Sequence, residues 1–145
     1  MIAVDTNILV YAHRDDAPFH QAASRILREL SEDSAAWALP WPCLHEFLSI
    51  VTHPRIFKPP TPLDQAWAQI EAWLESPSLV LLSEAAGYQT ILGDLLRRAQ
   101  VTGPRIHDAR IAALCVHHRV RELWTADRDF GRFAGLTVRN PLVAT

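Results

Sequence analysis

The chain has 145 residues, 49% of them hydrophobic and 21% charged, a composition typical of a globular domain rather than a disordered segment. Its formal net charge of -2 lacks the basic excess that is usual in nucleic-acid-binding domains. No apolar run reaches the ~18 residues that a membrane span requires, and no leader segment precedes Asp5. We therefore expect residues 1–145 to form one domain of a cytoplasmic protein that does not bind membranes.

Short apolar runs alternate with longer segments of helical periodicity, and this alternation predicts an α/β fold with a mostly parallel sheet flanked by helices. The first strand covers residues 2–4, and a polar segment is expected after it. The predicted helices cover residues 18–30, a segment from Pro42, a segment from Thr61-Pro62, residues 87–99 and residues 108–118. The other predicted strands are the short apolar runs 79–82, 123–125 and 136–138.

Two carboxylates directly follow predicted strands. Asp5 ends the first strand, and Asp127 follows strand 123–125. The carboxyl ends of parallel strands form the edge at which open α/β sheets bind ligands, which favours a functional site there. Aspartate also caps turns and helices, so local capping is an alternative for each residue, and Asp129 competes with Asp127 for any functional role.

Two further carboxylates lie on predicted helices. Glu46 projects from the Pro42 helix on the same side as Ile50, away from the main apolar stripe, and a solvated helix face is its alternative explanation. Asp108 shares the core-facing stripe of its helix with Ile111, and its place in the first turn suits an anion. A simple N-cap after Gly103-Pro104 explains Asp108 as well.

Several carboxylates gathered at one rim of a sheet would repel one another unless a cation offsets their charge. Ligands that are all oxygen suit Mg²⁺ or Mn²⁺ rather than Zn²⁺, and the seven histidines include no H-E-x-x-H motif. Such sites activate water for attack on a phosphodiester. Cys43 and Cys115 lack metal-ligand spacing and lie in apolar helical patterns, which predicts buried, reduced thiols.

At these positions the sequence resembles the PIN-domain family, and within it the VapC-type toxins of prokaryotic toxin–antitoxin pairs. The order and spacing of four motifs carry the resemblance over essentially the whole chain. The motifs are Val4-Asp5-Thr6-Asn7, Cys43-Leu44-His45-Glu46-Phe47, Asp108-Ala109-Arg110-Ile111-Ala112-Ala113 and Thr125-Ala126-Asp127-Arg128-Asp129-Phe130. The resemblance implies the three-layer PIN fold, with a central sheet of short strands between helices.

The resemblance also implies an activity, that of an endoribonuclease that uses Mg²⁺, or Mn²⁺, to hydrolyse RNA phosphodiester bonds. The implied catalytic metal ligands are Asp5, Glu46, Asp108 and Asp127. The residues implied to support them are Thr6, Asn7, Thr125 and Asp129. A homodimer and a VapB-type antitoxin that inhibits the enzyme are the implied protein partners.

Because the net charge is negative, RNA contacts are expected from local clusters of arginine, although a solvated surface is the alternative for each of them. The candidates are Arg14, Arg97, Arg98, Arg105, Arg110 and Arg128. A non-cleaving PIN-like module that binds RNA or protein is the alternative function, but the presence of all four acidic positions argues against it. A phosphatase of the haloacid-dehalogenase type would need an aspartate where the chain has Asn7.

Overall fold

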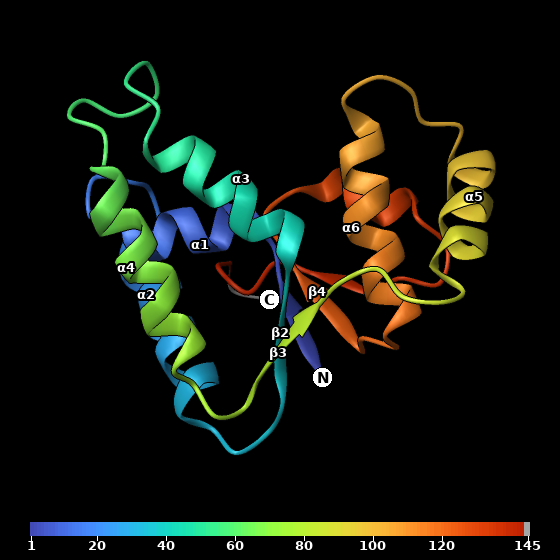
Figure 1. The fold of residues 1–145 in the computed structure, drawn as a ribbon, viewed down its shortest axis with the longest axis horizontal. Helices are drawn as coiled ribbons and strands as arrows, with labels where there is room; N and C mark the ends of the chain where they lie inside the picture. Colours follow the sequence, from blue (N-terminus) through green and yellow to red (C-terminus); the bar gives the residue numbers. More distant parts are fainter. Residues whose placement is uncertain (144–145) are drawn as a thin grey trace.

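The structure, a computed structural model, describes residues 1–143, so residues 144 and 145 of the expected domain lie outside the described part. A five-stranded sheet forms its centre (Figure 1), and all neighbouring strands are parallel. The strands are β1 (Ile2–Val4), β2 (Trp37–Pro40), β3 (Leu79–Leu82), β4 (Glu122–Trp124) and β5 (Val138–Arg139). The predicted α/β fold with a parallel sheet is confirmed.

Helices cover both sides of this sheet and complete three layers. In Figure 1, α1, α2 and α4 lie on one side of the strands, and α5 and α6 lie on the other. The helices are α1 (Thr6–His13), α2 (His20–Glu32), α3 (Trp41–Val51), α4 (Leu63–Leu74), α5 (Tyr88–Ala99) and α6 (Arg105–His117). None of the helices within residues 1–143 has the length and hydropathy needed to cross a membrane.

The order of the strands places β1 at the point where the chain changes direction across the sheet. The spatial order is β3-β2-β1-β4-β5, so the chain first builds the sheet from β1 toward β3 and later from β4 toward β5. Ile2 pairs with Trp37 on one side and with Glu122 on the other. Connections diverge at such a point and leave a crevice at the carboxyl ends of the strands. Asp5, which follows β1, stands at this position.

The prediction of a polar segment after the first strand is wrong, because helix α1 begins at Thr6. Asp5 is its N-cap and accepts a hydrogen bond from the Thr6 backbone N–H at 2.8 Å. Ile8 and Leu9 are fully buried in the core. A helix of this length is marginal in isolation, so the burial of these apolar residues stabilises it.

Strand β2 is absent from the predicted elements. Its four residues, Trp37–Pro40, are all buried, and it pairs with β1 and β3. A short continuous apolar run is the pattern of a strand buried on both faces, so the signal was present in the sequence. Strand β2 ends directly before α3, whose first turn contains Pro42. The strand pattern and the helix pattern therefore adjoin in the sequence.

Predicted boundaries also differ from the structure: the helix predicted at 18–30 is α2 at His20–Glu32, and the strand predicted at 136–138 is β5 at Val138–Arg139. Helix α6 begins at Arg105, so Asp108 lies within the first turn and Pro104 occupies the N-cap position. Helix α4 has Pro62 at its N-cap, and the hydroxyl of Thr61 instead accepts a hydrogen bond from Arg14 at 3.2 Å. The start of α6 places the Arg105 side chain beside Asp108, an arrangement that matters for the site.

Phe47 holds together the helices on the α1 side of the sheet. It is fully buried, and its ring makes edge contacts with Trp73 at a centroid distance of 4.9 Å and with His13 at 5.3 Å. These contacts join α3 to α4 and to α1. Since Glu46 precedes Phe47 on α3, this packing also fixes the helix that carries the Glu46 carboxylate.

We predict that Phe47→Ala lowers the free energy of unfolding by about 3–5 kcal/mol, because it removes a buried aromatic ring and leaves a cavity. Urea denaturation followed by circular dichroism measures this change. The control is Ile56→Ala, because Ile56 lies in the loop after α3 with 53% of its surface exposed. A loss below about 1 kcal/mol for Phe47→Ala would contradict the packing described above.

Candidate active site

Asp5 forms the buried centre of the site. Its Oδ1 accepts the capping hydrogen bond from the Thr6 N–H, and the Cys43 thiol donates to the same oxygen at 3.6 Å. Its Oδ2 accepts a hydrogen bond from the Thr125 hydroxyl at 2.7 Å. Only 4% of the residue is exposed, so these donors replace the water that a carboxylate would otherwise bind.

Thr125 follows β4 directly and Asn7 lies in the first turn of α1, and hydrogen bonds between these residues connect the two elements. The Asn7 amide donates to the Thr125 hydroxyl oxygen at 3.0 Å, and its carbonyl accepts from the Ala126 N–H at 3.1 Å. The Thr125 oxygen also accepts a hydrogen bond from the backbone N–H of Asp127 at 3.0 Å. This network places the backbone of Asp127 next to the side chain that contacts Asp5.

Glu46 reaches the same centre from α3. Its Oε2 accepts a hydrogen bond from the Thr6 hydroxyl at 2.8 Å, while the Thr6 backbone N–H binds Asp5. A single threonine therefore orients two carboxylates. The alternative of a fully solvated Glu46 is wrong, since the side chain is part-buried in a contact between α3 and α1.

Burial is the main cause that raises the pKa of Asp5 from 3.8 to about 6. The hydrogen bonds from Thr125 and Thr6 act in the opposite direction, and the Glu46 carboxylate raises the pKa through repulsion. A buried acid with a raised pKa, placed at the ligand-binding edge of an α/β sheet, is characteristic of a functional site.

The remaining carboxylates form an outer group around Arg105. The Arg105 guanidinium donates a hydrogen bond to Asp108 at 3.2 Å, pairs with Asp127 at 3.9 Å and donates a further hydrogen bond to Asp129. Asp127 also caps the short 3₁₀ helix at Arg128–Arg132 by accepting from the Asp129 N–H at 2.9 Å. Burial and then repulsion from Asp127 raise the pKa of Asp108, and the hydrogen bond from Arg105 opposes them.

The structure thus links the four predicted carboxylates through shared partners. Thr6 joins Asp5 to Glu46, Thr125 joins Asp5 to the Asp127 backbone, and Arg105 joins Asp127 to Asp108. Within residues 1–143, however, no three acidic, histidine or cysteine side chains already converge as metal ligands. Hydroxyl and backbone amide donors instead bind the oxygens of Asp5, Glu46 and Asp127, and the Arg105 guanidinium binds those of Asp108.

Comparison with known proteins identifies the family of this chain. The PIN-domain profile matches residues 2–136. The chain belongs to the PIN-domain family. Ribonuclease VapC43 of Mycobacterium tuberculosis is 34% identical to it over 142 residues, which cover 98% of this chain and 96% of that relative. Ribonuclease VapC37 of the same organism is 31% identical and covers 97% of both chains.

Solved structures place this PIN domain in the same fold. The crystal structure of VapBC2 from Rickettsia felis, bound to a DNA fragment from its promoter, has a TM-score of 0.70 at 21% identity and covers 97% of this chain and 98% of its own. The crystal structure of Mycobacterium tuberculosis VapC20, described as a toxin that cleaves the sarcin-ricin loop, has a TM-score of 0.67 at 16% identity. It covers 94% of this chain and 99% of its own. The predicted three-layer PIN fold is confirmed.

The candidate RNA-binding arginines of this PIN domain do not form one cluster. Arg14 lies at the far end of α1 from Asp5, where it pairs with Asp16 at 2.7 Å and covers the Phe57 ring. Arg105 contacts the outer carboxylates, and the others have separate surroundings. Arg98 pairs with Asp94, Arg110 pairs with Glu84, and Arg97 and Arg128 are exposed.

The contact of Cys43 with Asp5 is a feature of the site that the sequence did not indicate. Cys43 and Cys115 are both buried free thiols, as predicted. Burial raises the pKa of Cys115 to about 12 and that of Cys43 well above its usual value, with the Asp5 charge as a further cause in each. Both thiols are therefore neutral, and the Cys43 thiol is the one that contacts Asp5.

We predict that Asp5→Asn becomes more stable relative to the wild type between pH 4 and pH 7.5, with both proteins free of metal. The folded chain binds the Asp5 proton more tightly than the unfolded chain, so the stability of the wild type falls as pH rises from about 4 through about 6. Asparagine has no such charge and loses the acceptor for the Thr125 hydroxyl at both pH values, so its relative gain between them reaches at most about 3 kcal/mol. Thermal melts in EDTA measure it, and an equal effect at both pH values would contradict the buried charge.

Proposed function

We propose that this chain is a metal-dependent endoribonuclease and the toxin of a VapBC-type toxin–antitoxin module. The observation that carries the proposal is the linked set of carboxylates at the switch point of the sheet, Asp5, Glu46, Asp108 and Asp127. The similarity to proteins named VapC ribonucleases supports the same reaction. We also propose that residues 1–145 act as a single PIN domain in the cytoplasm.

The donor chemistry of the site fits a hard divalent cation, Mg²⁺ or Mn²⁺. All four proposed ligands, Asp5, Glu46, Asp108 and Asp127, offer carboxylate oxygens, which these ions prefer. The outer carboxylates already surround one positive charge, that of Arg105. A divalent cation bound there would lower the pKa of a water molecule and stabilise negative charge on the phosphate.

The chain's own residues would prepare the site for this reaction. The Thr125 and Thr6 hydroxyls hold Asp5 and Glu46 in fixed orientations, so the site loses little freedom when it acts. The buried position of Asp5 keeps bulk water away from the inner oxygens. Glu46, held by only one hydrogen bond at Oε2, is the residue proposed to orient the attacking water.

A cleft of about 270 Å³ between α3 and α6 offers an approach for RNA. Glu46 lines it from α3 and Arg110 from α6, and the exposed His45 and His107 line it as well. Imidazole and guanidinium groups donate hydrogen bonds to phosphate oxygens, so this lining suits a nucleic-acid backbone. Arg110, Arg105 and Arg128 are the arginines near this edge that we propose as RNA contacts.

Protein partners are the second part of the proposal. Several structural neighbours of this fold are toxin–antitoxin complexes, including one from Klebsiella pneumoniae. Three apolar side chains, Leu63, Trp67 and Leu74, are exposed along α4, with 64%, 44% and 36% of their surfaces accessible. Exposed apolar rows of this kind are typical of protein interfaces. We therefore propose a homodimer and an inhibitory VapB-type antitoxin.

We predict that the purified protein cleaves RNA in the presence of Mg²⁺ or Mn²⁺ and that EDTA abolishes cleavage. Asp108→Asn should reduce the rate by more than about 100-fold, because losing even an outer partner of a metal ligand costs 10–100-fold. Gel analysis of total cellular RNA reports the cleavage. The matched control is Asp64→Asn, which changes an exposed carboxylate on α4. This variant should cleave RNA at the wild-type rate.

Cleavage by Asp108→Asn at the wild-type rate would contradict the assignment of this residue. Cleavage that continues in EDTA would contradict the metal dependence. RNA binding without cleavage by the wild-type protein, in either metal, would favour the alternative of a non-cleaving PIN-like module.

A further inference from the structure

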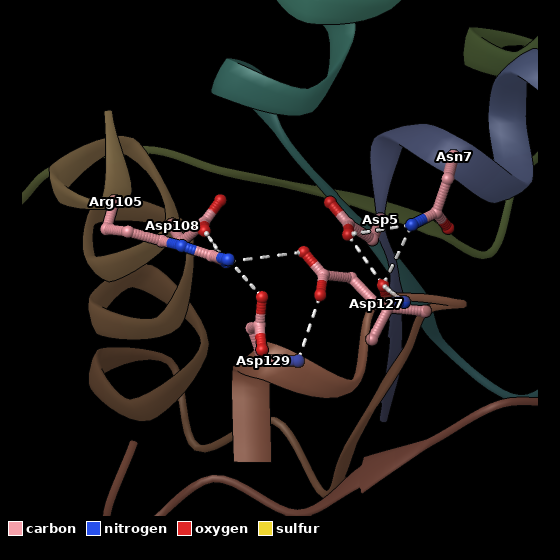
Figure 2. Close-up of polar contacts among 7 residues, drawn as sticks. Asp5, Asn7, Arg105, Asp108, Asp127 and Asp129 are labelled. Atoms are coloured by element: carbon pink, nitrogen blue, oxygen red, sulfur yellow. Dashed lines mark hydrogen bonds and ion pairs between the residues drawn. The ribbon is translucent and has the colours of Figure 1, made fainter. Parts of the chain in front are cut away.

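Arg105 occupies an unusual position in this site. It is the first residue of α6, and its guanidinium lies between Asp108, Asp127 and Asp129 (Figure 2). Two of these three residues are proposed metal ligands. Of the ion pairs in residues 1–143, those of Arg105 are the ones that engage the proposed ligands, since the others pair with residues outside the site.

The carboxylates around Arg105 come from two separate segments. Asp108 lies one turn further along α6, whereas Asp127 and Asp129 belong to the loop after β4. The hydrogen bond from the Asp129 N–H to Asp127 fixes these two residues relative to each other. The guanidinium therefore bridges α6 and the β4 loop, and it offsets the repulsion between three facing carboxylates.

A divalent cation and this guanidinium compete for the same oxygen atoms. The Nη1 atom lies 3.2 Å from Asp108 Oδ2 and 3.9 Å from Asp127 Oδ2. A cation bound by both carboxylates would sit close to the guanidinium, and two positive charges at such a distance repel each other. The Arg105 side chain is 40% exposed and so has room to move, with Asp129 as a remaining partner.

We propose that Arg105 is an internal counter-ion that holds Asp108 and Asp127 together in the metal-free protein and is displaced from them when a divalent cation binds. This inference rests on the proposed metal-dependent function. It makes Arg105 a positioning residue that sets the affinity of the site for its metal. The Arg105 guanidinium would then compete with the cation for the oxygens of Asp108 and Asp127.

Titration of Mn²⁺ into the metal-free protein, followed by the loss of the free-ion electron paramagnetic resonance signal, tests this proposal. Arg105→Gln removes the charge and keeps a side chain that can form hydrogen bonds. We expect it to bind Mn²⁺ more tightly than the wild type, with a dissociation constant roughly tenfold lower. Arg105→Lys keeps the positive charge and should remain within about threefold of the wild type.

Arg98→Gln is the matched control, because Arg98 pairs with the exposed Asp94 on α5, outside the site. It should bind Mn²⁺ as the wild type does. Thermal melts give a second measurement. Arg105→Gln should melt at a lower temperature than the wild type without metal, since the carboxylates then repel, and it should gain more from added Mn²⁺.

The outcomes separate this inference from the proposed function. If the wild type binds Mn²⁺ and Arg105→Gln binds it equally or more weakly, the counter-ion proposal is wrong and the metal site stands. If the wild type, Arg105→Gln and Arg105→Lys all fail to bind Mn²⁺ while remaining folded, both the metal site and the counter-ion proposal are wrong. If Arg105→Lys binds Mn²⁺ as tightly as Arg105→Gln, and both bind it more tightly than the wild type, the counter-ion proposal is also wrong.

Discussion

The hydrogen bond between the Thr125 hydroxyl and the Asp5 carboxylate, 2.7 Å long, joins the ends of two neighbouring parallel strands. It forms because β1 and β4 are in register, and the ladder continues as the Asp5 backbone N–H donates to the Trp124 carbonyl at 3.0 Å. The inner part of the site is placed relative to this contact. Asn7 and the backbone of Asp127 bind the same threonine oxygen, and Thr6 carries the link to Glu46.

The site contains two groups of carboxylates that are stabilised in different ways. Asp5 is buried, and short neutral donors within the chain compensate for its lost hydration. The outer carboxylates are half exposed, and a guanidinium compensates for their mutual repulsion. Asp127 connects the groups, because its backbone binds Thr125 while its side chain faces Arg105. Neutral donors and one guanidinium within the chain thus offset part of this negative charge.

Much of this arrangement could be predicted from the sequence. Apolar runs that end in a carboxylate predicted both the strands and the edge at which Asp5 and Asp127 lie. The sequence leaves capping and function as alternatives for these two residues, yet the structure has both caps, and each capping side chain also faces the site. The order of the four motifs indicated the family because their spacing follows from the order of the strands.

Other features depend on contacts that periodicity does not encode. Helix α1 is short and follows β1 without a loop, so burial of Ile8 and Leu9, rather than helix propensity, determines it. The sequence places Arg105 among the arginines proposed for RNA binding, and that assignment stays a prediction. Its contact with Asp129 spans 24 positions of sequence and arises only when α6 lies beside the β4 loop. The contact of the Cys43 thiol with Asp5 likewise arises only when α3 lies beside the end of β1.

The most direct test of the proposed metal site is a crystal structure of the protein grown with Mn²⁺, with anomalous diffraction used to locate the ion. We expect an anomalous peak among the carboxylates of Asp5, Asp108 and Asp127, with the Arg105 side chain moved away from Asp108. A saturated crystal with no peak at this edge of the sheet would contradict it, as would a peak bound by residues outside the site.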